Sequence, residues 1–121
     1  LPVTEASSAA AKPSRPPLST KEFAQLAAAA PKTVVVFKTA WCTPCREMVP
    51  VIEATKKAID GNSSLAILEL DWDHETTVAE AEKVTGVPVF IQYVDGVEKA
   101  RHSGKLSESE LLKFLEGNEK N

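Results

Sequence analysis

The chain has 121 residues, of which 43% are hydrophobic and 26% are charged, and this size and composition suit a single globular domain. Its net charge of −3 argues against a general nucleic-acid binder, and it contains no apolar run long enough to span a membrane. Two cysteines are too few for a disulfide framework or for a complete four-ligand zinc site. We therefore expect no metal site. We also expect a monomer.

Residues 1–18 are rich in Ala, Ser and Pro, and we expect a flexible segment here, ahead of one folded domain at residues 19–121. The chain begins with Leu1 rather than Met, so we expect that a preceding segment was removed. A Ser-rich, acid-poor stretch is typical of organelle-targeting peptides, but with Arg15 as its one arginine the segment fits a plain linker equally well. We expect a cytoplasmic protein, with an organelle as the alternative if a targeting peptide has been cleaved.

The chain then predicts a first helix and a buried strand. The helix begins at Ser19 or Thr20, has Phe23 and Leu26 on its apolar side, and is stopped by a proline at position 31. The sequence TVVVF that follows is a continuous run of β-branched and aromatic residues, typical of a strand buried on both faces.

A second helix is predicted to follow this strand. It begins at Cys42 or Thr43 and ends at Gly61. Pro50 falls inside it and should kink it, because proline removes one backbone hydrogen bond and crowds the preceding turn.

The rest of the chain predicts three strands and two helices. Asp95 and Gly96 form a hairpin turn between the last two strands, and Ser107 with Glu110 forms a capping box at the last helix. The inward side of that helix carries Leu111, Leu112 and Leu115. In chain order the predicted elements are a strand at 65–70, a helix at 76–84, a strand at 87–94, a strand after the turn, and a helix that ends at 117.

This order of elements predicts an α/β fold with a central mixed β-sheet flanked by helices on both faces. Strands that are joined through helices are expected to run parallel, and the final hairpin is expected to be antiparallel.

Cys42 and Cys45 lie where the buried strand ends and the second helix begins. The unpaired N–H groups and positive end of a helix favour thiolate over thiol, so we expect Cys42 to be a nucleophile with a lowered pKa. Cys45 lies about one helical turn later and is placed to resolve a mixed disulfide formed on Cys42. A zinc half-site and an inert core pair are the competing interpretations, but the spacing of His74 and His102 does not fit metal ligands.

Several motifs together resemble the thioredoxin family over residues 19–121. They are WCTPC at 41–45, the helix-kinking Pro50, GVPVF at 86–90, DG at 95–96, and Gly104. The resemblance implies a thioredoxin fold and dithiol–disulfide exchange with protein disulfide substrates. It also implies electrons from a separate flavin-dependent thioredoxin reductase. No bound cofactor is needed, because the Cys42–Cys45 pair is itself the redox group.

The resemblance also implies a substrate site. Pro88 is expected to follow a cis peptide bond beside the sulfurs, and the backbone of Val87 is expected to pair with an extended substrate segment. Trp72 lacks this motif context and is expected to pack in the protein. The implied substrate-binding residues are Trp41, Thr43, Pro44, Val87, Pro88 and Gly104.

Two positions depart from the family. Val36 stands where the family usually has a buried aspartate, and Glu69 stands where it usually has a lysine. Either proton transfer at Cys45 is slower, or Glu69 supplies the proton acceptor with a pKa raised by desolvation, or Glu69 points to solvent. Lys38, on the same face as Val36, is expected to favour the Cys42 thiolate.

We interpret the chain as a thiol–disulfide oxidoreductase that reduces protein disulfides through Cys42 and Cys45, and we keep two alternatives open. One is an oxidase or isomerase of the same fold, and the other is a binding module with little redox turnover.

Overall fold

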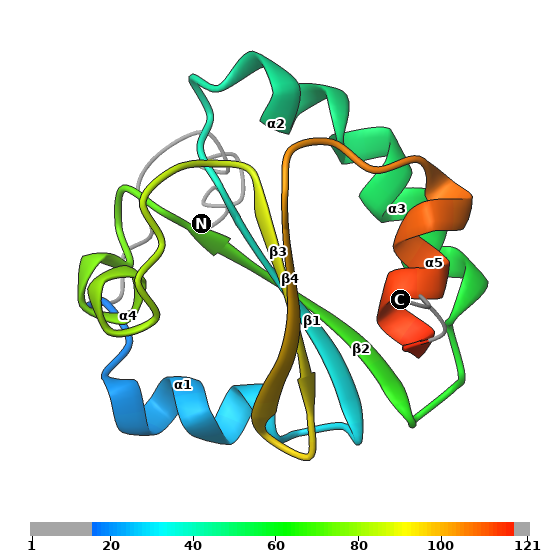
Figure 1. Ribbon diagram of the computed structural model, residues 1–121, viewed down its shortest axis with the longest axis horizontal. Coiled ribbons are helices and arrows are strands. Elements are labelled where there is room, and N and C mark those ends of the chain that lie inside the picture. Colours follow the sequence, from blue (N-terminus) through cyan, green and yellow to red (C-terminus); the bar gives the residue numbers. More distant parts are fainter. Residues whose placement is uncertain (1–15, 118–121) are drawn as a thin grey trace, which may run out of the picture.

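The computed structural model describes residues 16–117 as a four-stranded sheet with helices on both faces (Figure 1). Most of the flexible segment predicted at residues 1–18 lies outside the described residues. The elements are α1 (Thr20–Ala27), β1 (Lys32–Lys38), α2 (Thr43–Glu47), α3 (Val49–Ala58), β2 (Leu65–Asp71), α4 (Thr76–Ala81), β3 (Val89–Val94), β4 (Val97–Ser103) and α5 (Glu108–Glu116).

The strand order in the sheet is β2-β1-β3-β4. β1 pairs with β2 in parallel, but β3 is antiparallel to β1, so the prediction that all strands joined through helices are parallel is wrong for β3. The reason is the length of α4, whose six residues span about 9 Å, less than half the length of a seven-residue strand. The chain therefore re-enters the sheet from the end at which β2 leaves it.

Local capping signals place the helix starts as predicted. Ser19 and Ser107 each accept a hydrogen bond from the backbone N–H three residues later, and each forms a full capping box.

The predicted second helix is broken into α2 and α3 at Met48, just before Pro50. Leu26 was expected on the apolar side of α1, but this residue is 40% exposed, so that prediction is wrong.

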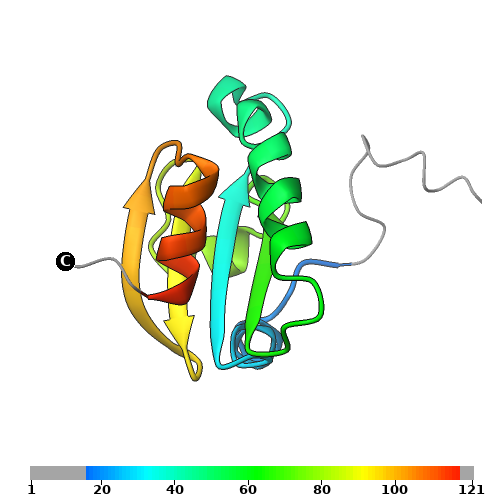
Figure 2. The ribbon, with the colours of Figure 1, turned by 90° about the vertical axis from the view of Figure 1, so that its right-hand side faces the viewer.

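The core consists of two apolar layers, one on each face of the sheet, because β1 alternates its side chains between them. Val35 and Phe37 face α1 and α4, while Val34 and Val36 face α3 and α5. Figure 2 shows α3 and α5 packed side by side over the second face. The predicted buried strand is confirmed, since residues 33–37 are all buried.

The hairpin between β3 and β4 turns at Asp95 and Gly96, as predicted, and both have positive φ (52° and 85°). At the other end of the sheet, the carboxyl end of β1 leads into α2, beside the loops that precede β3 and follow β4 (Figure 1). The two cysteines lie at this end.

In the described part of the chain, no helix combines the length and apolar character that crossing a bilayer requires.

Candidate active site

Cys42 and Cys45 form a compact dithiol at the start of α2. Cys42 is the N-cap residue, and its Sγ accepts a hydrogen bond of 3.2 Å from the backbone N–H of Cys45. Both are free thiols, and their exposed fractions are 6% for Cys42 and 1% for Cys45. This difference in exposure suits an outer sulfur that meets a substrate and an inner one that attacks it from behind. The predicted reactivity of Cys42 stays a prediction.

The inner thiol is held in its protonated form at neutral pH. Burial, together with the hydrogen bond to Cys42, raises the pKa of Cys45 to about 11. A hydrogen bond from the backbone of Thr39 and the charge of Lys38 act in the opposite direction. Lys38, predicted to act on Cys42, thus favours the thiolate of Cys45.

The loop before β3 lies directly against the outer sulfur. The thiol of Cys42 donates to the carbonyl oxygen of Val87 at 3.8 Å, and the Val87–Pro88 peptide bond is cis, as the family resemblance implied. Gly104, with φ of 99°, donates its backbone N–H to the carbonyl oxygen of Pro88 at 3.0 Å. Three of the predicted substrate-binding residues are therefore brought together beside Cys42.

Trp41 forms an exposed aromatic surface next to the dithiol. Trp41 is 62% exposed, and its indole N–H donates to a carboxylate oxygen of Asp73 at 2.7 Å. The ring of Trp72 lies 6.4 Å away and packs against the core, as expected for a structural tryptophan. Thr43 and Pro44 are both exposed in the first turn of α2.

Asp73 was missed by the sequence reasoning. The signal that could have found it is position, because Asp73 follows β2 just as Trp41 follows β1, and these two strands are parallel neighbours.

Within residues 16–117, no group of three or more His, Cys, Asp or Glu side chains is arranged to hold a metal ion.

Comparison with known proteins places this site in a family. The family model described as "Thioredoxin" matches residues 15–117, which is most of the chain. The chain belongs to the thioredoxin family. It is 35% identical to a putative thioredoxin-5 of Dictyostelium discoideum over 88 residues, covering 71% of this chain and 83% of that protein. It is also 34% identical to a thioredoxin-like protein of Synechocystis (slr1139) over 95 residues, covering 78% and 85%.

Solved structures agree with the predicted thioredoxin fold. A thioredoxin from Halobacterium salinarum superposes with a TM-score of 0.71 at 25% identity, covering 88% of this chain and 93% of that one. The thioredoxin of Fasciola hepatica superposes with a TM-score of 0.67 at 28% identity, covering 82% and 90%. The fold is therefore a thioredoxin fold.

The two departures from the family pattern have a structural explanation. Val36 is fully buried, and Glu69, its neighbour across the parallel ladder, forms ion pairs with Lys38 at 3.3 Å and with Lys56. Burial raises the pKa of Glu69, but the hydrogen bond and charge of Lys56, aided by Lys38, outweigh burial and hold the pKa below its usual value. The prediction that desolvation raises this pKa is therefore wrong, because two lysines flank the carboxylate.

Glu69 should contribute stability at neutral pH that is lost in acid. Its pKa is lowered on folding, so its contribution is present above the unfolded value of about 4.3 and disappears as pH falls through the lower folded value. Replacing Glu69 with Gln should lower the free energy of unfolding by about 1 kcal/mol at pH ~7, and the difference should vanish near pH ~2. Urea unfolding at the two pH values measures this.

The control is Glu53→Gln, an exposed position on α3. It should leave the free energy of unfolding unchanged. Because Glu69 is ionised throughout the neutral range, Glu69→Gln should also leave the shape of the pH profile of insulin reduction unchanged between pH ~6 and ~8. A lost inflection in that range would instead identify Glu69 as the proton acceptor first predicted.

Proposed function

We propose that the chain reduces protein disulfides through Cys42 and Cys45. Membership of the thioredoxin family supports thiol–disulfide oxidoreductase activity in general. The observation that carries the specific proposal is the dithiol itself, with Cys42 Sγ 3.2 Å from the backbone nitrogen of Cys45 and next to Val87. An outer sulfur beside a peptide-binding edge and a buried sulfur behind it are what a two-step exchange requires.

The reaction has two exchange steps. The thiolate of Cys42 attacks one sulfur of a substrate disulfide, forms a mixed disulfide and releases the other substrate sulfur as a thiolate. The thiol of Cys45 then passes its proton, through water, to the substrate thiolate released in the first step and attacks Cys42. This attack forms the Cys42–Cys45 disulfide and releases the second substrate sulfur as a thiolate, which takes a proton from solvent. The substrate gains two electrons and two protons, and a reductase of the flavin-dependent type restores the dithiol by supplying the same number.

The substrate chain is proposed to bind across the loop that precedes β3. The backbone of Val87 would hydrogen bond to an extended substrate segment, in the manner of an added β-strand. Trp41 supports this because its ring is exposed at the rim, and Thr43, Pro44 and Gly104 line the same end of the sheet. Pro88 shapes the loop.

A similar solved structure, with a TM-score of 0.71, was determined for the thiol resolving mechanism of a yeast mitochondrial 1-Cys peroxiredoxin via glutathione/thioredoxin systems. Peroxiredoxins are therefore one candidate class of substrate.

The family is found in more than one compartment. Chloroplastic thioredoxins of Arabidopsis thaliana and Oryza sativa are among the relatives, and so are thioredoxins of bacteria. An organelle and the cytoplasm are therefore both proposed locations.

The proposal is tested by trapping the mixed disulfide. In Cys45→Ser, the second exchange step is blocked, so proteins from an oxidised extract should accumulate as disulfide-linked adducts on Cys42. Non-reducing gels and mass spectrometry would identify the adducts, and the matched control Cys42→Ser/Cys45→Ser should form none. A binding module with little turnover would instead retain the same noncovalent partners in both variants and in the unsubstituted chain, and this result would contradict the proposal.

A further inference from the structure

The loop that presents Val87 and Pro88 begins in a backbone conformation that needs support. α4 ends at Ala81, and Lys83 follows with a φ of 59°, in the left-handed region that non-glycine residues rarely adopt. A residue held there costs free energy and persists only when its surroundings hold it in place. Contacts at Glu82 and Lys83 therefore control where the following residues lie.

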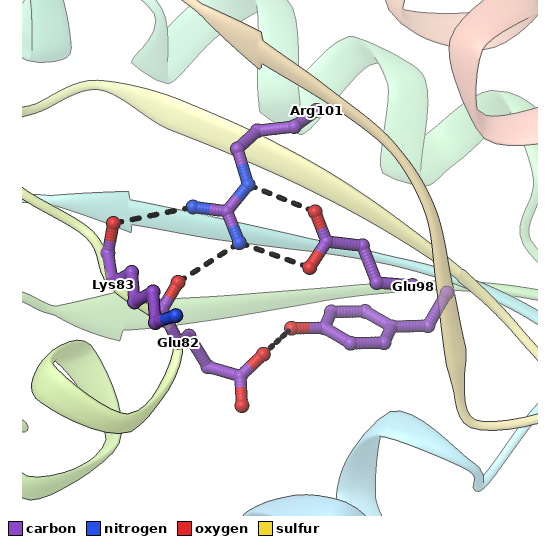
Figure 3. A network of polar contacts seen from close by, with 5 residues as sticks. Glu82, Lys83, Glu98 and Arg101 are labelled. Atoms are coloured by element: carbon purple, nitrogen blue, oxygen red, sulfur yellow. Dashed lines mark hydrogen bonds and ion pairs between the residues drawn. The ribbon is translucent and has the colours of Figure 1, made fainter.

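Arg101 on β4 supplies these contacts (Figure 3). Its guanidinium donates to the carbonyl oxygen of Glu82 at 2.8 Å and to that of Lys83 at 3.4 Å. The same guanidinium is held in a bidentate ion pair with Glu98, with both N···O distances 2.9 Å. A planar fork of five donors can bind one carboxylate and two carbonyls together, which a lysine ammonium cannot reproduce.

A second contact attaches the same point to the core. The hydroxyl of Tyr93 on β3 donates to the carboxylate of Glu82 at 2.5 Å. Tyr93 is buried, and its ring packs edge-on against Phe23 of α1 at 5.6 Å. The end of α4 is thus connected to both strands of the hairpin.

The supported loop and Arg101 share one surface hollow. Its volume is about 320 Å³, and its lining includes Lys83, Val87, Pro88, Arg101 and Gly104. Arg101 therefore lies on the wall of a hollow that also contains the proposed substrate-binding backbone.

We propose that Arg101 is a positioning residue for substrate binding. It holds the carbonyl groups of Glu82 and Lys83 so that the backbone of Val87 is presented to the substrate chain at the correct angle. Arg101 touches neither sulfur in the described contacts, so its effect falls on the binding of an extended chain and not on the exchange chemistry. This inference rests on the proposed reduction of protein disulfides.

The test compares a protein disulfide with a small one. In Arg101→Gln, the KM for insulin should rise about fivefold, the effect of one net hydrogen bond, with kcat unchanged. The rate with cystine should stay the same, because a small disulfide needs no pairing with the Val87 backbone. Arg101→Lys should behave like Arg101→Gln, since it keeps the charge but lacks the fork.

The matched control is Lys99→Gln, an exposed cation on the same strand, which should leave KM unchanged. An unchanged KM for insulin in Arg101→Gln would overturn the inference, as would an equal loss with cystine or full activity in Arg101→Lys. Failure of the proposed function would be seen separately, because the unsubstituted chain would then reduce neither disulfide.

Discussion

Replacing Val36 with Asp, the residue that the family usually has at this position, should destabilise the chain by about 3 kcal/mol at pH ~7. Val36 is fully buried in the layer that packs against α3 and α5, among Met48, Ile52 and Phe90. An aspartate there would lose the burial of an apolar side chain and would place a carboxylate in apolar surroundings. Urea unfolding measures the difference.

The neighbouring strand makes the substitution worse. Glu69 is the register partner of Val36, and its carboxylate already engages Lys38 and Lys56. A second carboxylate would therefore meet a like charge in place of the family's lysine, and burial together with this charge would raise its pKa. Between the ordinary and the raised pKa the folded state would bind more protons than the unfolded state, so stability should fall as pH rises.

Two further variants separate charge from shape. Val36→Asn has the shape of the aspartate without its charge and should show no such pH dependence. Val36→Asp combined with Glu69→Lys restores the family's pair and should recover at least ~1 kcal/mol of the loss. Equal stability of Val36→Asp and the unsubstituted chain at neutral pH would show that the lysines here can hold both carboxylates.

Much of the fold could be predicted because its signals are local. The capping boxes at Ser19 and Ser107 lie within four consecutive residues each, and the Asp95–Gly96 turn depends on two. The position of the dithiol follows from a buried strand that ends just before a helix. Each of these features can be read without knowing what packs against it.

The missed features depend on contacts between distant parts of the chain. Lys56 reaches Glu69 from α3, and the sequence alone does not show that it faces β2. Arg101 holds carbonyl groups nearly twenty residues earlier, which leaves no periodic pattern. The direction of β3 was predicted wrongly because it depends on whether α4 is long enough to return the chain to the opposite end of the sheet.

In the proposed mechanism, the two sulfurs of one motif have different roles. Cys42 at the start of α2 is the proposed nucleophile, while Cys45 stays protonated at neutral pH, because burial and the hydrogen bond to Cys42 raise its pKa to about 11. A cysteine in an unstructured peptide is only about 3% thiolate at pH ~7. A helix start that favours the anion should therefore increase the rate at Cys42 about tenfold over that peptide.

The most direct measurement is the pH dependence of alkylation of the reduced chain with iodoacetamide, with the modified residue located by mass spectrometry. We predict that Cys42 is modified at pH ~7 about ten times faster than a peptide cysteine, while Cys45 becomes reactive only as pH approaches about 11. Equal rates at the two cysteines, or a rate at Cys42 no greater than that of the peptide, would contradict the account.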